Sequence, residues 1–261
     1  MKKSTRLRVL LSGVIAVALS LSAVPAMAAS PRTAPPANYT CSGGEIPSGS
    51  YANVSVTGPC TVGVGAVIDI TGNVSVAAGA SLDAQSASAT ISVARNVTAS
   101  AGSFLGLGCQ PPSYTGNSAH ECTVDPEGVS VISVGGNVTA NGAMAVMLNG
   151  ITVRGNVTLT GGGSTIPWSI KNNAIDGNLT VTGQRTEWLG ALFNTIGGNA
   201  TLTNIALSDP HPGAPGVYIV RNNVARNLTC NGLTPGVSGG FVPGSVNVVG
   251  GNATGQCAAL V

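Results

Sequence analysis

One asparagine recurs along the chain at nearly regular intervals, each time followed by Val, Leu or Ala and then by Ser or Thr. Successive copies are about 22 residues apart, if the one interval of 41 residues is taken as two repeats. A period of this length is typical of solenoids, in which each repeat packs only on its neighbours. The chain is therefore expected to form about ten stacked repeats. The asparagines are Asn53, Asn73, Asn96, Asn137, Asn156, Asn178, Asn199, Asn227 and Asn252.

Distance from this asparagine, called position n, predicts which side chains point inward, because successive side chains of a strand point to opposite faces. Positions n−3, n+1 and n+3 are mostly aliphatic, as in Ile70, Val74 and Val76, so we expect them to fill the interior. Position n−1 is mostly glycine. We interpret the Gly-Asn pair as a corner between two short strands, because both residues tolerate the left-handed backbone conformation that a tight bend needs.

Position n−5 divides the repeats into two groups, isoleucine in the first half of the chain and asparagine in the second. The alternation counted from position n places both the isoleucines and the asparagines inside. A single buried amide is costly, but asparagines one strand spacing apart can hydrogen-bond to one another and to the backbone. We predict an interior isoleucine stack followed by an interior asparagine ladder. The isoleucines are Ile68, Ile91, Ile132 and Ile151, and the asparagines are Asn173, Asn194, Asn222 and Asn247.

These features resemble right-handed parallel β-helix proteins. The Gly-Asn-Val/Leu-Thr repeats, with the ending Val-Gly-Gly-Asn-Ala-Thr-Gly-Gln-Cys at 249–257, are similar to exported proteins of bacteria, actinobacteria in particular. The resemblance covers residues 41–257. It implies an all-β fold, a single right-handed parallel β-helix (solenoid) of about ten coils of roughly 22 residues with surface loop insertions, and it implies no activity.

The start of the chain has the features of a secretory signal peptide. Four basic residues precede an apolar run at 9–24, and Ala-Met-Ala at 26–28 forms a small-residue cleavage site. We expect a signal peptide at 1–28, a flexible segment at 29–40 and the β-helix domain at 41–261. No later stretch has the length that a membrane crossing needs. The mature protein is expected to be secreted, in the extracellular space or on the cell wall.

The six cysteines all follow the expected cleavage site, and an even number in an exported chain indicates disulfides. Pairing between neighbours in the sequence is the simplest of 15 arrangements. It would close the first coil, one surface loop and the last coil, and the two end bridges would substitute for caps. Zinc binding is disfavoured because the chain has no Cys-x-x-Cys spacing. The neighbour pairs are Cys41 with Cys60, Cys109 with Cys122, and Cys230 with Cys257.

Charge and composition exclude nucleic-acid binding as an expected function. Removal of residues 1–28 leaves seven Lys and Arg against nine Asp and Glu, so the net charge of +2 becomes −2. The chain has no basic patch, and its aromatic content is only 3%, whereas nucleic-acid sites need cations and stacking rings. No spacing indicates a cofactor or a metal.

Catalytic residues, if present, are expected on the outer face beneath insertions. A polysaccharide lyase would use Arg154 beside Asp176, with Lys171 nearby; the alternative is a surface ion pair. A glycosidase would use two carboxylates, for which Glu187 and Asp209 are the candidates, although neither lies in a recognisable motif.

Three insertions carry the other conspicuous polar and aromatic residues. The Cys109–Cys122 loop contains His120 and Glu121, a second excursion contains Arg185 and Trp188, and a third contains His211 and Tyr218. An imidazole beside a carboxylate suits acid-base or metal chemistry, but solvated loop residues are the simpler interpretation. Trp168 and Trp188 are candidate platforms for sugar stacking or packing residues for the insertions.

Hydroxyl side chains occupy position n+2 in all nine repeats, and threonine also occupies n+4 in three successive repeats. Such a Thr-x-Thr grid resembles the surface of ice-binding β-helices. Threonine is also a common strand residue that needs no binding function. The grid consists of Thr158, Thr160, Thr180, Thr182, Thr201 and Thr203.

The sequence thus favours an exported, non-enzymatic β-helix scaffold that contacts carbohydrate through the Thr/Asn face and the region of Trp188. A carbohydrate-active enzyme, either a lyase or a glycoside hydrolase, is the alternative, and ice binding is a minor one. The expected partner is a polysaccharide of the cell envelope or the environment.

Overall fold

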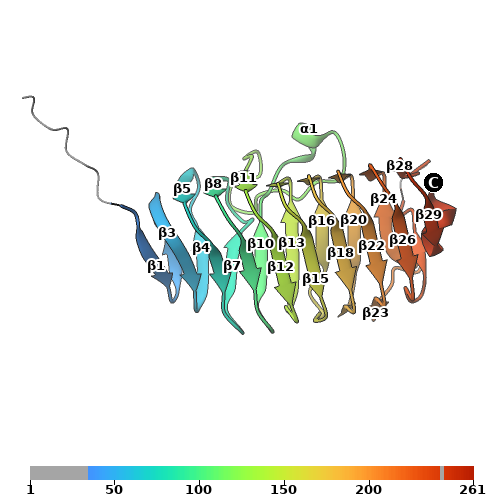
Figure 1. Ribbon diagram of the computed structural model, residues 1–261, viewed down its shortest axis with the longest axis horizontal. Coiled ribbons are helices and arrows are strands. Elements are labelled where there is room, and N and C mark those ends of the chain that lie inside the picture. The colour runs from blue at the N-terminus through green and yellow to red at the C-terminus, as the bar shows by residue number, and fades with distance from the viewer. Residues whose placement is uncertain (1–34, 242–243) are drawn as a thin grey trace, which may run out of the picture. The chain divides into compact units, whose positions relative to one another are not determined.

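The computed structural model describes residues 35–241 and 244–261, so the predicted signal peptide lies outside the described residues. Within these ranges the strands form parallel sheets of 18, 9 and 2 strands. Strands that are far apart in the sequence stack in chain order from β1 to β29 (Figure 1). The chain is a parallel β-helix, as the repeat predicts.

The 18-stranded sheet receives two short strands from most coils. Among the described residues, β1 and β3 are each the single strand that one coil contributes to this sheet. The other strands form eight consecutive pairs, one pair for each coil, so the sheet has ten coils. Its strands are β1 (Ala37–Cys41), β3 (Gly49–Val56), β5 (Ala66–Ile70), β6 (Val74–Val76), β8 (Ala89–Val93), β9 (Val97–Ala99), β11 (Val131–Val134), β12 (Val138–Asn141), β14 (Thr152–Val153), β15 (Val157–Thr160), β17 (Ala174–Ile175), β18 (Leu179–Thr182), β21 (Thr195–Ile196), β22 (Ala200–Thr203), β25 (Asn223–Val224), β26 (Leu228–Asn231), β28 (Val248–Val249) and β29 (Ala253–Gly255).

The nine-stranded sheet forms a second wall and receives one strand from each coil that contributes to it. Its strands are β2 (Gly44–Ile46), β4 (Pro59–Val62), β7 (Ser81–Ala84), β10 (Phe104–Leu107), β13 (Ala145–Asn149), β16 (Trp168–Lys171), β20 (Leu189–Leu192), β24 (Val217–Val220) and β27 (Val237–Ser238). A small third sheet pairs β19 (Arg185–Thr186) with β23 (Ala206–Leu207), and the helices are α1 (Pro112–Thr115) and the 3-10 helix η1 (Gln256–Leu260).

The interval of 41 residues between Asn96 and Asn137 is one coil and not the two that we predicted. Strand β12 pairs directly with β9, and the Asn137 N–H donates to the Asn96 side chain. The additional length is the insertion closed by the Cys109–Cys122 disulfide, which leaves the stack after β10 and returns at β11.

The tenth coil lies instead at the N-terminal end, where residues 37–40 are ordered as part of β1 and are not the flexible segment that we expected. Asn38, Tyr39 and Thr40 repeat the signature, and Thr40 pairs in register with Ser55. The Asn53 side chain donates to Asn38, and the Tyr39 and Tyr51 rings lie 5.0 Å apart. These contacts continue the repeat one coil before its first recognised copy.

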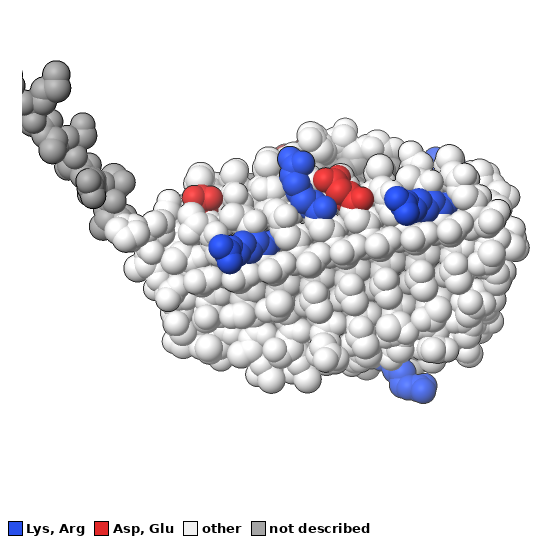
Figure 2. Space-filling model, in the orientation of Figure 1, with Lys and Arg blue, Asp and Glu red and all other residues white. Residues whose placement is uncertain are grey.

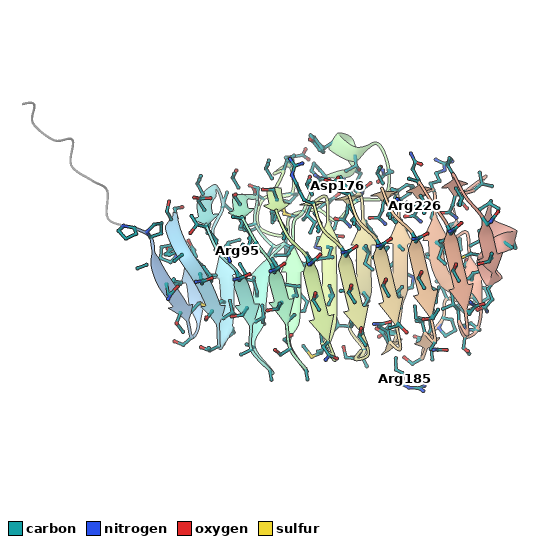
Figure 3. All side chains as sticks on the ribbon, in the orientation of Figure 1. Arg95, Asp176, Arg185 and Arg226 are labelled. Atoms are coloured by element: carbon teal, nitrogen blue, oxygen red, sulfur yellow. A yellow bond between two sulfur atoms is a disulfide. The ribbon has the colours of Figure 1, made fainter. Side chains whose placement is uncertain are left out.

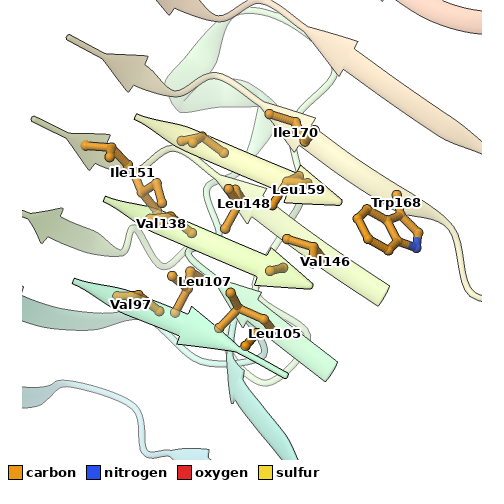
Figure 4. Packing of buried hydrophobic residues seen from close by; sticks show 14 of the residues in the cluster. Val97, Leu105, Leu107, Val138, Val146, Leu148, Ile151, Leu159, Trp168 and Ile170 are labelled. Atoms are coloured by element: carbon orange, nitrogen blue, oxygen red, sulfur yellow. The ribbon is translucent and has the colours of Figure 1, made fainter. Parts of the chain in front are cut away.

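The interior is filled by the positions that the phase predicts. Residues at n−3, n+1 and n+3 are buried along most of the stack. Figure 4 shows Val138 and Leu159 of the larger sheet meeting Leu148 of the smaller one. The predicted isoleucine stack is confirmed, because its four members are at most 7% exposed and the first three pair in register.

The predicted interior asparagine ladder is also confirmed. The Asn194 side chain accepts from both the backbone N–H and the side-chain amide of Asn173, at 3.1 and 2.9 Å. Its own amide donates to Asn222 and to the Ile170 carbonyl, at 2.9 and 2.8 Å. The ladder begins at the Ile151 N–H, which donates to Asn173. Each buried amide is therefore paired, which removes the cost of burying it.

A second ladder, which we did not predict, is formed outside by the repeat asparagines themselves. Along this outer ladder the N–H of each asparagine donates to the side-chain oxygen of the previous coil, as Asn178 does to Asn156 at 2.9 Å and Asn199 to Asn178 at 2.8 Å. The direction is opposite to that of the interior ladder, whose donors belong to the earlier coil.

The Gly-Asn corner does not use left-handed backbone, so this part of the prediction was wrong. Positive φ angles occur instead one residue before the interior ladder, at Asn172 (56°), Phe193 (59°) and Arg221 (48°). Glycine is favoured at n−1 because a Cβ there would overlap the outer asparagine of the previous coil, as at Gly198, where it would lie 2.4 Å from Asn178 Oδ1.

Two coils carry arginine at n−1, and their outer ladder bonds are longer. The N–H to oxygen distance is 3.2 Å after Arg95 and 3.1 Å after Arg226, compared with 2.8 or 2.9 Å after the glycines. A side chain is therefore tolerated at this corner where the ladder bond lengthens.

We predict that Gly198→Ala lowers the free energy of unfolding by about 1–3 kcal/mol, because its Cβ overlaps the Asn178 side chain. Arg226→Ala is the matched control, since its coil already accommodates a Cβ, and it should change stability by less than about 0.5 kcal/mol. Urea unfolding measures both. Equal losses in the two variants would contradict the steric explanation of the repeat.

The three disulfides join the cysteine pairs that we predicted. The last coil has a further cap that was not predicted, the helix η1, which contains Cys257. Its Gln256 side chain bonds both the N–H and the carbonyl of Leu233 at 2.8 Å, and the Leu260 carbonyl accepts from the Asn247 side chain at 3.0 Å. The interior ladder thus ends on this cap.

Candidate functional site

The predicted threonine grid is present on the larger sheet. Strands β15, β18 and β22 place Thr158, Thr180 and Thr201 in one row and Thr160, Thr182 and Thr203 in the next. The Thr203 hydroxyl donates to Thr182 at 2.8 Å. On the face in Figure 2 most charged residues lie near one edge and one cation lies at the opposite edge, and the surface over these strands is uncharged. An ice-binding role for this face stays a prediction.

The lyase candidates form an exposed ion pair. Arg154 Nη1 lies 3.9 Å from Asp176 Oδ2, and the two side chains are 74% and 57% exposed. Such a pair contributes little to stability. In Figure 3 Asp176 lies on the edge that carries Arg95 and Arg226, opposite the edge with Arg185. Lys171 is on β16, in the other sheet, and no ion pair joins it to Asp176 among the described residues.

The glycosidase candidates come from adjacent coils. Glu187 follows β19 and Asp209 follows β23 by two residues, and these two strands pair in parallel. Glu187 is half-buried, and Asp209 is exposed. Neither residue lines a described cavity. The structure therefore brings these two carboxylates to neighbouring coils.

A recess of about 220 Å³ lies on the outer face of the nine-stranded sheet, and we call it the outer aromatic pocket. The Trp188 and Tyr218 rings meet edge to face at a centroid distance of 5.3 Å, and Phe241 lies 6.3 Å from Tyr218. Edge-to-face contact is a favoured geometry for aromatic pairs. The lining residues are Ser118, Lys171, Trp188, Leu192, Tyr218, Val220, Gly240 and Phe241.

Two of the insertions predicted from the sequence reach this pocket. The Cys109–Cys122 loop contributes Ser118 and the second excursion contributes Trp188. Tyr218, which we assigned to the third insertion, belongs to strand β24 of the nine-stranded sheet. Phe241, on a turn after β27, was missed. Its signal was present, since it follows two glycines in the long interval before the last repeat. Sequence spacing gave no indication that these segments would meet.

Gly190 has no side chain, and this leaves space for the Trp188 ring in the wall of the outer aromatic pocket. On β20 a Cβ at Gly190 would lie 2.3 Å from the Trp188 ring and 2.4 Å from Leu192. The indole therefore lies across its own strand beside Leu192. Trp188 and Leu192 also pack with the buried Tyr218 and Val220, in a small apolar cluster separate from the interior.

Burial shifts the titration of two lining groups. The pKa of Lys171 is lowered, because burial disfavours the charged ammonium. The pKa of Tyr218 is raised by burial, and a hydrogen bond with Trp188 acts in the opposite direction. Lys171 Nζ also lies 5.7 Å from the centroid of the Trp188 ring, within the range of a cation–π contact.

The two histidines of the insertions differ in their surroundings. Burial lowers the pKa of His120, Lys171 lowers it further, and Asp83 and Glu121 act in the opposite direction. His211 is exposed and stacks edge to face on Phe241 at 4.9 Å. Within the described residues no group of three or more His, Cys, Asp or Glu side chains could hold a metal ion.

Trp168 does not form a platform, which corrects one of our two interpretations of it. The residue is fully buried, and its indole N–H donates to the Met144 carbonyl at 3.2 Å. It packs in the interior cluster with Ile170 (Figure 4). Trp188 lies instead on the outer face, in the lining of the outer aromatic pocket.

No family model matches the chain, and neither the curated proteins nor the solved structures contain a significant match to it. Among the described helices none is long and apolar enough to span a bilayer. The three disulfides fit an extracellular protein, since such bonds persist in oxidising environments.

Proposed function

We propose that the protein is an exported, non-enzymatic β-helix scaffold of the extracellular space or cell envelope that binds carbohydrate at the outer aromatic pocket. One observation carries the proposal: the rings of Trp188, Tyr218 and Phe241 meet at a recess of about 220 Å³. Ring faces suit the apolar C–H face of a sugar, while Ser118 and Lys171 supply hydrogen-bond donors.

Export is supported by three features. The basic start, the apolar run and the Ala-Met-Ala site at 26–28 have the pattern of a secretory signal. The three disulfides agree with that destination. The similarity of the repeats to those of exported actinobacterial proteins is a third argument of the same kind.

We predict that a glycan array detects binding by the wild-type protein and that Trp188→Ala weakens it at least tenfold, about 1.4 kcal/mol, because the largest ring of the pocket is removed. Thr180→Val is the matched control on the threonine face and should leave binding unchanged. Loss of binding in Thr180→Val, but not in Trp188→Ala, would place the site on the threonine face instead.

The enzyme alternative has one specific observation in its favour, the position of Glu187 and Asp209 after the paired strands β19 and β23. The two carboxylates of a glycosidase lie about 5–10 Å apart. Release of reducing ends from the glycans that bind, abolished by Glu187→Gln, would replace the scaffold proposal with a hydrolase.

A further inference from the structure

We infer that the sugar bound in the outer aromatic pocket is anionic and that Lys171 binds its negative group. This inference rests on the proposed function and narrows its ligand class. Lys171 ends β16 on the outer face of the nine-stranded sheet, where Asn149 and Leu192 are its neighbours in register. Among the described residues that line the pocket, it carries the one formal charge.

The ammonium of Lys171 has no anionic partner among the described residues. The one ion pair within 4.0 Å in that part of the chain joins Arg154 to Asp176 on the other sheet. His120, whose pKa Lys171 lowers, is a basic neighbour and supplies no negative charge. The Trp188 ring, 5.7 Å from Nζ, offers a weaker interaction with the cation.

A partly buried cation without an anion is costly. Removal from water raises the free energy of the charged form, and a cation–π contact recovers only part of it. A carboxylate or phosphate on the ligand would recover more, because charge-assisted hydrogen bonds are roughly twice as strong as neutral ones. The pocket is therefore better matched to an anion than to a neutral group.

The other residues that line the pocket suit a sugar ring beside the negative group. Leu192 and Val220 continue the row of Lys171 on the next two strands, and Trp188 and Tyr218 stand beside them. A ligand that fills this recess presents an apolar face to the rings and a negative group to the lysine. A uronic acid and a sugar phosphate share this chemistry.

Three single-ring sugars distinguish recognition of a neutral sugar, a carboxylate and a phosphate: glucose, glucuronic acid and glucose 6-phosphate. NMR titration of the wild-type protein should show at least tenfold tighter binding of one or both anionic sugars than of glucose. The anionic sugar that binds tighter identifies carboxylate or phosphate as the group recognised. Lys171→Gln should remove this preference, and Arg185→Gln, an exposed cation outside the pocket, should leave it intact.

Equal affinity of the wild-type protein for the three probes would overturn the inference and leave the proposed function standing. Absence of any sugar binding, on the array and in solution, would overturn both. The wild-type comparison needs no variant, so it decides the question even where Lys171→Gln fails to fold.

Discussion

Replacing Asn194 with leucine is expected to lower the free energy of unfolding by about 3–6 kcal/mol. The variant keeps the volume of the side chain but leaves two donors of Asn173 without an acceptor and removes the side-chain donor to the Ile170 carbonyl. Each buried unpaired group costs about 1–3 kcal/mol. Urea unfolding followed by circular dichroism measures the loss.

The outer ladder supplies the control for this experiment. Asn178 makes the same kinds of bonds as Asn194, to the N–H and side-chain amide of the next asparagine, but it is exposed. Water can replace those bonds, so Asn178→Leu should cost less than about 1 kcal/mol. Equal losses at the two positions would show that burial does not determine the contribution of a ladder bond.

Trp168→Ala is expected to destabilise the protein by about 3–5 kcal/mol, because it leaves a large cavity in a packed interior and removes the indole donor to the Met144 carbonyl. Trp188→Ala should have a much smaller effect on stability, since the ring is only half-buried. Thermal unfolding of both variants, with the glycan array as second measurement, tests the pair.

The two tryptophans should therefore separate stability from binding. Trp168→Ala protein that remains folded at low temperature should still bind the array, whereas Trp188→Ala should be stable and fail to bind. The reverse pattern would contradict the assignment of Trp168 to the interior and Trp188 to the pocket.

The interior could be predicted from the sequence because one asparagine sets the phase of its neighbours. Counting in twos from it placed Ile70, Val74 and Asn194 inside, and the structure agrees. The alternation counted from the asparagine cannot be continued across a corner of variable length, so the sequence did not show that Trp168 is interior and Trp188 is not. Each strand has its own set of inward positions: Ile170 is buried on the strand of Trp168, and Gly190 leaves room for the Trp188 ring.

The candidate site was predicted only in its parts. Insertions are visible as long intervals between asparagines, but their direction of folding depends on contacts made in three dimensions. The interval from Asn96 to Asn137 has the length of two coils, and pairing of β9 with β12 decides that it is one. The steric reason for a residue choice is hidden in the same way: the glycine before most of the repeat asparagines is explained by the asparagine side chain of the previous coil.

The interior ladder has a defined first and last bond, from the Ile151 N–H at one end to the Leu260 carbonyl at the other. Between them, Asn173, Asn194 and Asn222 each make equivalent bonds to the coil that follows. A duplicated or deleted coil in this half would find matching partners on both sides. Evolution, or an engineer, can thus adjust the length of the C-terminal half in whole coils while the cap is kept.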